Sequence, residues 1–183
     1  MQYMVIDSAI GTLIVASVAL LFASAGLHKL RHIRRFEEII SSYALMPALE
    51  RLRISRAVPI LEIAVAAGLL VDVWRPYAGT AGIVLLLAYA GAIAINLRRG
   101  RRNIACGCGG PDERRPISGW MVWRNILISL VLAVALQPWA RRPLVFTDGI
   151  TIVFGLLTIA LVYLCTDRLL GYMQRPTQLR SSR

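Results

Sequence analysis

The chain has 183 residues, of which 57% are hydrophobic and 17% charged, and its formal net charge is +11. A soluble domain of this length carries more charge and fewer aliphatic side chains, so the composition indicates an integral membrane protein. The basic residues lie in short segments between apolar blocks. That arrangement sets membrane topology and argues against nucleic-acid binding.

Five apolar segments approach the roughly 20 residues that a helix needs to cross a hydrocarbon core of about 30 Å. Because residues 1–8 contain no Lys or Arg, the first segment is interpreted as a retained span and not as a signal peptide. We predict a single transmembrane domain over residues 1–170 and a basic cytoplasmic tail over residues 171–183. The five predicted spans are residues 9–27, 57–74, 77–97, 120–136 and 150–170.

A different kind of helix is predicted between the first two spans, over about residues 30–46. Apolar side chains recur there every three or four residues, and charged side chains fill the positions between them. This pattern is typical of an amphipathic helix that lies in the membrane surface and ends near Pro47. The alternative is a solvated connector.

The second and third spans are separated by little more than Arg75 and Pro76, which predicts a tight antiparallel helical hairpin. Of the Lys and Arg residues, 17 lie between spans one and two, between spans three and four, or at the C-terminal end. Only 3 lie on the opposite side, at Arg75, Arg141 and Arg142. The positive-inside rule therefore places the N-terminus outside the cytoplasm and the C-terminus inside it.

Polar side chains gather near the predicted cytoplasmic ends of the spans. Charged groups at this depth are costly unless they are paired or hydrated, and they usually face the interior of a bundle. We expect Glu62 to pair with Lys29 or Arg124; the alternative is that these two cations extend to the lipid headgroups. The predicted supporting cluster consists of Lys29, Glu62, Asn96, Arg124 and Asn125.

A polar loop over residues 98–118 contains Cys106, Gly107 and Cys108. Two thiols one residue apart can close a small, strained disulfide, and strained disulfides exchange readily. The arginines that flank the loop favour the thiolate form that this exchange requires. Cys106 and Cys108 are therefore the candidate catalytic pair of a thiol–disulfide oxidoreductase, and Cys165 is a candidate third thiol near the same membrane face.

Two other interpretations of these thiols stay open. They could hold a soft metal such as Cu(I) or Zn(II), with Cys165 and either His28 or His32 completing the ligand set. They could also be incidental surface thiols. The sequence contains no CxxC, HExxH, dinucleotide-binding glycine pattern or nucleophile elbow, which argues against a self-sufficient hydrolase or dehydrogenase.

The order of these motifs resembles the MauE family of methylamine-utilisation proteins, within the wider group of DoxX-like redox-associated membrane proteins. The resemblance covers roughly residues 9–136. It implies an all-α integral membrane protein with a four-helix DoxX-like bundle, a fifth transmembrane helix and the interfacial amphipathic helix. The motifs that carry it are "SAGLHKL" (Ser24–Leu30), "PILEI" (Pro59–Ile63), "AINLRRGR" (Ala94–Arg101), "CGCGG" (Cys106–Gly110) and "WMVWRN" (Trp120–Asn125).

The resemblance also implies a function. Members of this family are thought to support disulfide formation in periplasmic methylamine dehydrogenase, whose small subunit is rich in disulfides, together with a thioredoxin-like partner, MauD. The chain is then expected in the bacterial inner membrane, with Cys106 and Cys108 as the redox pair and a membrane quinone as a candidate cofactor.

The charge rule places the thiol loop in the cytoplasm, whereas the implied client lies in the periplasm. One resolution is an electron relay across the bundle. Another is a loop that folds back among the helix ends and exchanges electrons with a quinone in the bilayer. A third is a non-catalytic scaffold or chaperone in which the cysteines are secondary.

Overall fold

The computed structural model describes residues 6–44, 47–102, 104–107, 116–139, 142–143 and 145–173. Within these residues the fold is all-α, as predicted. In chain order its helices are α1 (Ser8–Arg31), α2 (Ile33–Tyr43), α3 (Ala48–Leu69), α4 (Arg75–Arg98), α5 (Gly119–Ala135) and α6 (Phe146–Met173).

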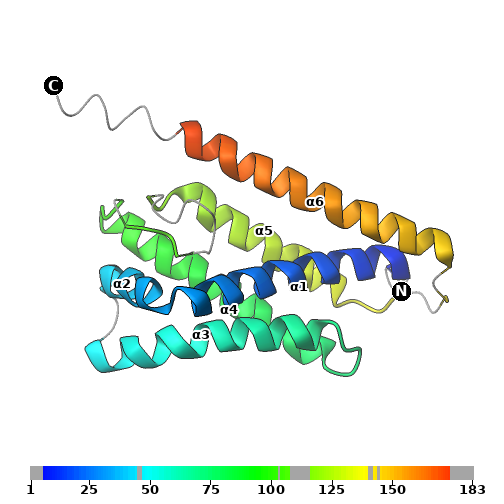
Figure 1. The fold of residues 1–183 in the computed structure, drawn as a ribbon, viewed down its shortest axis with the longest axis horizontal. Helices are drawn as coiled ribbons and strands as arrows, with labels where there is room; N and C mark the ends of the chain where they lie inside the picture. Colours follow the sequence, from blue (N-terminus) through cyan, green and yellow to red (C-terminus); the bar gives the residue numbers. More distant parts are fainter. Residues whose placement is uncertain are drawn as a thin grey trace.

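Four of these helices form a closed antiparallel bundle (Figure 1). Helix α1 packs against α3 and α5, and α4 packs against the same two helices, so that the four surround one core. Helix α6 lies outside this ring against α1, and α2 lies beside α3 at the end of the bundle opposite the N-terminus. The arrangement is four helices plus one long and one short addition. Its relation to DoxX-like proteins stays a prediction.

The core of the bundle contains aliphatic side chains, one large aromatic ring and small residues. Phe22 is its largest side chain and is 1% exposed. Small residues let the helices approach closely, which is how membrane helices gain packing energy without a hydrophobic driving force. The buried members of the core are Val15, Val18, Ala19, Phe22, Val65, Ala66, Leu69, Leu85, Leu86, Leu132 and Ala135.

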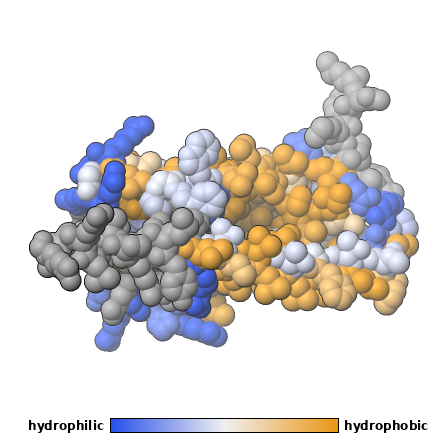
Figure 2. All heavy atoms as spheres, turned by 90° about the horizontal axis from the view of Figure 1, so that it is seen from above, coloured by the Kyte–Doolittle hydropathy of each residue, from blue (hydrophilic) through white to orange (hydrophobic). Residues whose placement is uncertain are grey.

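The surface of the bundle is apolar in the middle and hydrophilic at its ends (Figure 2). Among the described residues, three helical stretches are long and apolar enough to cross a membrane: α1, α4 and the Phe146–Thr166 part of α6. Helix α5 is apolar but shorter, with 17 residues. A belt of apolar side chains between polar ends is the surface of an integral membrane protein, and the full count of five spans stays a prediction.

Helix α3 differs most from its predicted segment. It begins at Ala48, before the apolar segment starts, because helix formation does not require apolar side chains. It ends at Leu69, where the Arg75 guanidinium donates to the Leu69 carbonyl at 3.4 Å and pairs with Asp72. Arg75 and Pro76 belong to the first turn of α4, where a proline costs no hydrogen bond.

The amphipathic helix after α1 is also observed, and it is shorter than predicted. Helix α2 spans Ile33–Tyr43 and buries Phe36 on one face. It ends at Ala44, whose φ of 49° lies in the left-handed region and cannot continue the helix. The basic tail was predicted over residues 171–183; helix α6 continues to Met173, and the rest of the tail lies outside the described residues.

At the N-terminal end of the bundle, ion pairs connect the start of α1 with the segment that leads into α6. Asp7 caps α1 by accepting from the Ala9 amide at 2.8 Å. The Arg142 guanidinium donates to Asp7 at 2.9 Å and to Asp148 at 2.7 Å. Arg142 holds the pKa of the Asp7 carboxyl below its usual value. Ion pairs therefore hold together the end of the bundle that lies away from the predicted thiol loop.

Helix α1 approaches α3 closely at Gly26. A Cβ at this position would lie 2.9 Å from both the Pro59 carbonyl oxygen and the Ile63 side chain. Gly26→Val should therefore push the two helices apart and lower the free energy of unfolding by about 1–3 kcal/mol. Thermal unfolding in detergent measures this change. Gly91→Val on α4 is the control, because a Cβ there would meet none of the described residues within 4 Å. Equal losses for the two variants would contradict the close packing at Gly26.

Candidate functional site

The central polar contact is a buried ion pair between Lys29 of α1 and Glu62 of α3. The two side chains are 3% and 1% exposed. The sequence left Lys29 and Arg124 as alternative partners for Glu62, and the structure pairs Glu62 with Lys29. Gly26 lies one helical turn before Lys29, so the close approach of the helices brings the two charges together.

Tyr89 of α4 completes this contact. Its hydroxyl donates to Glu62 Oε1 at 2.7 Å and accepts from Lys29 Nζ at 3.2 Å. The sequence analysis did not select Tyr89. One signal was available: Tyr89 precedes Asn96 by two helical turns, which places both residues on one face of α4. We call Lys29, Glu62 and Tyr89 the buried triad.

Helix α2 covers the triad from one side. The Lys29 ammonium lies 5.2 Å from the centroid of the Phe36 ring and 4.8 Å from that of Tyr89. An aromatic face attracts a cation more strongly when water is excluded, so these two rings help to hold the ammonium inside the bundle. Lys29 therefore does not extend to the lipid headgroups.

The described part of the cysteine loop packs against α2. Cys106 is disulfide-bonded and Cys165 is free, while Cys108 lies outside the described residues. The Tyr43 hydroxyl donates to the Cys106 carbonyl at 3.2 Å. Burial raises the pKa of Tyr43 to about 12, so this donor keeps its proton at any physiological pH.

Gly107 is required by the geometry of this loop. Its φ of +69° lies in the left-handed region, where a side chain is strained. A Cβ at Gly107 would also lie 2.9 Å from the Ile39 side chain of α2. The glycine between the cysteines thus allows both the bend of the chain and its contact with the helix.

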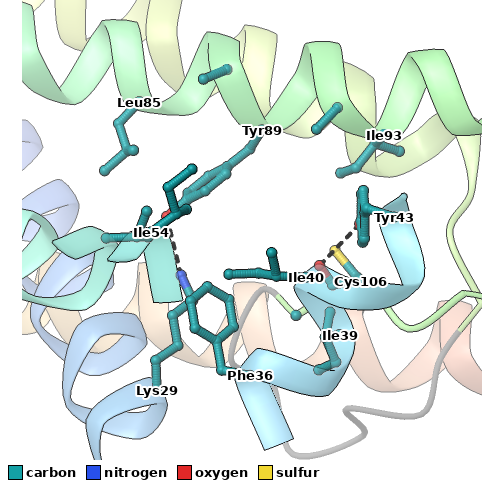
Figure 3. Close-up of a pocket in the computed structure, with 14 residues that line it drawn as sticks. Lys29, Phe36, Ile39, Ile40, Tyr43, Ile54, Leu85, Tyr89, Ile93 and Cys106 are labelled. Carbon is teal, nitrogen blue, oxygen red and sulfur yellow. Dashed lines mark hydrogen bonds between the residues drawn. The ribbon is translucent and has the colours of Figure 1, made fainter. Parts of the chain in front are cut away.

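Cys106 lines a cavity of about 200 Å³ that reaches the buried triad (Figure 3). Lys29 and Tyr89 lie at one end of it, and Cys106 with Tyr43 lies at the other. We call it the thiol cavity. Its remaining lining is almost wholly apolar and comes from α2, α3 and α4: Phe36, Ile39, Ile40, Ile54, Val58, Leu85, Ala88, Ala92 and Ile93, with Gly107 of the loop.

A larger cavity of about 630 Å³ lies on the other side of the triad, lined mainly by α1, α5 and α6. We call it the lipid-side cavity. It shares Lys29 and Tyr89 with the thiol cavity and adds Glu62, Arg124 and Asn125. The Arg124 guanidinium donates to the Tyr163 hydroxyl of α6 at 3.1 Å. The two cations of the predicted cluster therefore lie in different surroundings. Lys29 lines both cavities, whereas Arg124 lines only the lipid-side cavity.

Two other predicted residues line neither cavity. Asn96 is fully buried, and its side-chain amide donates to the Ala92 carbonyl of its own helix at 3.1 Å. Cys165 is exposed on α6. The structure therefore does not bring Cys165 into the cavity that Cys106 lines.

The soft-metal interpretation finds no ligand cluster in the part of the chain that the structure describes. Among those residues, no group of three or more His, Cys, Asp or Glu side chains is arranged to hold a metal ion. His28 and His32 lie with their ring centroids 4.9 Å apart near the end of α1. Neither histidine lines the cavity of Cys106.

Comparison with known proteins decides the family. The family described as methylamine utilisation protein MauE matches residues 7–138. The chain belongs to the MauE family. Its similarity to a Paracoccus denitrificans protein named methylamine utilization protein MauE is 36% identity over 167 residues, covering 91% of this chain and 90% of the relative. A Methylophilus methylotrophus protein of the same name is 30% identical over 174 residues, covering 94% and 92%.

The family match includes the main features of the site. Residues 7–138 include the helices α1 to α5, the buried triad and the cysteine motif of this MauE-family chain. Helix α6 lies beyond the match, although the Paracoccus denitrificans and Methylophilus methylotrophus relatives extend the similarity to more than nine-tenths of the chain. No solved structure matches the chain.

The ion pair should behave as one unit in this MauE-family protein. Lys29→Met or Glu62→Gln leaves one buried charge without its partner and should cost about 3–5 kcal/mol of stability. The double variant removes both charges and should be more stable than either single variant. Unfolding of the four proteins in detergent gives this double-mutant cycle. Additive losses would show that the two charges do not interact.

Proposed function

We propose that this MauE-family chain is a membrane thiol–disulfide exchange protein that supports disulfide formation in periplasmic methylamine dehydrogenase. Its partners in this proposal are a MauD-like thioredoxin-fold protein and the small subunit of the dehydrogenase. The observation that carries the proposal is the disulfide-bonded Cys106, which lines a cavity together with a buried lysine. The family name connects this chemistry with methylamine utilisation.

The proposed exchange has two steps. A thiolate of the partner or client attacks one sulfur of a Cys106–Cys108 disulfide and forms a mixed disulfide, while the other cysteine leaves as thiolate. The second client thiol then attacks the mixed disulfide. The client gains a disulfide, and Cys106 and Cys108 become a dithiol that has received two electrons and two protons.

The buried triad has a supporting role in this proposal. A cation beside a cysteine lowers the pKa of the thiol and so raises the fraction of reactive thiolate. Lys29 lines the same cavity as Cys106, and Glu62 with Tyr89 fixes the position of its ammonium group. Lys29 lies at the opposite end of this cavity from Cys106, so we assign it a long-range electrostatic stabilisation of the leaving thiolate across the apolar cavity, and we assign Glu62 and Tyr89 the positioning of its ammonium group.

The loop supports the version of the proposal in which the thiols work among the helix ends. Ile104, Gly107 and Ile117 are buried against the bundle, and the Ile117 amide donates to the Ile104 carbonyl at 3.0 Å. Met121 of α5 and Ile93 of α4 pack in the same cluster. The described segments that flank the cysteine motif are thus part of the bundle, which supports thiols that work among the helix ends.

The two cysteines of the motif should be essential and Cys165 should not. In cells that make methylamine dehydrogenase, Cys106→Ser and Cys108→Ser should each lower dehydrogenase activity by about tenfold or more. The disulfides of the small subunit should be lost in parallel, as read by thiol alkylation and gel shift. Cys165→Ser is the matched control and should keep wild-type activity.

Two results of this experiment would contradict the exchange mechanism. Full maturation of the dehydrogenase by the Cys106→Ser/Cys108→Ser double variant would indicate a scaffold. Stoichiometric Cu(I) or Zn(II) in the purified protein, lost in Cys106→Ser, would indicate a metal carrier.

We also propose the topology given by the positive charges, with the cysteine loop on the cytoplasmic side. In a Cys165→Ser background treated with a permeant reductant, a membrane-impermeant maleimide should label Cys106 and Cys108 only after the membrane is permeabilised. The control is Asp72→Cys in a cysteine-free background, because Asp72 is 85% exposed in the turn at the other end of the bundle. That cysteine should be labelled in intact cells. Rapid labelling of the loop from outside would reverse the topology.

A further inference from the structure

We infer that the lipid-side cavity binds the headgroup of an isoprenoid quinone, with Arg124 and Asn125 as donors to its ring oxygens and Glu62 as the acceptor for a hydroxyl of the reduced form. This inference rests on the proposed function, because a quinone would be the oxidant that restores the Cys106–Cys108 disulfide. The argument uses the shape of the cavity, the unpaired polar atoms at one end of it, and its common wall with the thiol cavity.

The cavity has the shape and surface that an apolar chain requires. Its volume is about 630 Å³, and apolar side chains of α1, α5 and α6 make up most of the lining. Several lining side chains are also exposed on the outer surface, including Leu20 at 55% and Leu127 at 58%. Because these residues lie in the apolar belt of the bundle, the cavity opens toward the lipid and is accessible to a molecule dissolved in the bilayer.

One end of the cavity carries polar atoms that have no hydrogen-bond partner among the described residues. They are Glu62 Oε2, Arg124 Nε and Asn125 Nδ2. Glu62 is 1% exposed and Asn125 is 3% exposed, so water does not readily replace the missing partners. A buried polar group without a hydrogen-bond partner is destabilising, so a ligand that supplies the partner is favoured there. Three such groups at one end of an apolar cavity form a built site for the polar end of an amphipathic ligand.

The three atoms match a quinone better than a phospholipid. Arg124 and Asn125 supply donors, which suit the two carbonyl oxygens of a quinone, whereas the Glu62 carboxylate is an acceptor. A hydroquinone offers hydroxyl donors to that carboxylate, so the site matches the reduced form as well. A phosphodiester has only acceptors, so it offers no donor to the unpaired Glu62 oxygen.

The buried triad connects this site to the thiols. Lys29 and Tyr89 line both cavities, and both donate a hydrogen bond to Oε1 of Glu62. The other carboxylate oxygen of Glu62, Oε2, is the atom without a partner among the described residues. In the proposed step the Cys106 and Cys108 thiols are oxidised to the disulfide and the quinone is reduced to hydroquinone. In this net reaction the two thiols release two electrons and two protons, and the quinone takes up both, with the protons on its ring oxygens.

The test is binding of decylubiquinone to the full-length protein in phosphatidylcholine nanodiscs. Ala160 of α6 lines the cavity, whereas Val162 of the same helix does not and is 59% exposed. Ala160→Phe should weaken binding about tenfold or more by filling the cavity, and Val162→Phe should bind as the wild type does. Asn125→Leu should weaken binding by removing a donor while the cavity stays open. Circular dichroism checks that each variant keeps its helical content.

Three outcomes would overturn the inference: no saturable binding to the wild type, equal binding by Ala160→Phe and Val162→Phe, or a cavity that takes up short-chain phosphatidylglycerol in place of decylubiquinone. The Cys106→Ser/Cys108→Ser variant separates this inference from the proposed function. It should still bind decylubiquinone, because Cys106 does not line this cavity and neither cysteine is among the proposed ring contacts. Binding by a protein whose cysteines are dispensable for maturation would therefore refute only the exchange function.

Discussion

The structure depends on one buried contact, the ion pair between Lys29 and Glu62. It joins α1 to α3, and the Tyr89 hydroxyl extends it to α4, so three of the four bundle helices meet at a single hydrogen-bonded group. Taking two charges out of water costs several kcal/mol each, and this cost is offset only when the pair is well aligned and further hydrogen-bonded. The helices must therefore keep the register that brings these three side chains together. Gly26 permits that register by letting α3 approach α1 closely.

The position of the triad also divides the interior into two compartments. The thiol cavity lies between α2, α3 and α4, and the lipid-side cavity lies mainly between α1, α5 and α6. Lys29 and Tyr89 form part of the wall between them. A group in such a wall can respond to chemistry on both sides, because its hydrogen bonds are shared. This arrangement makes the ion pair relevant to function as well as to stability.

Much of the fold follows from local properties of the sequence, and parts of the site do not. Apolar segment length predicted the long helices, since the number of residues that crosses a bilayer is set by helix rise. The period of apolar residues predicted α2. The cost of an unpaired charge inside the membrane predicted that Glu62 is paired. The ends of α3 were missed, because its first residues are helical without being apolar and because the Arg75 cap at Leu69 is a side-chain contact. Tyr89 was missed because the sequence does not show whether an aromatic residue in an apolar segment packs in the core or makes a polar contact.

The sequence by itself determined that this is an all-helical membrane protein with a polar cluster at one end and a Cys-Gly-Cys loop beside it. These properties depend on composition, period and charge, which are local quantities. Only the tertiary structure decided that Glu62 pairs with Lys29 and that the Arg124 guanidinium donates to Tyr163. It also decided that Cys106 lines a cavity that Cys165 does not line. The physical reason is that partner choice depends on which helix faces meet. Packing between distant segments sets those faces, down to the space left by Gly26.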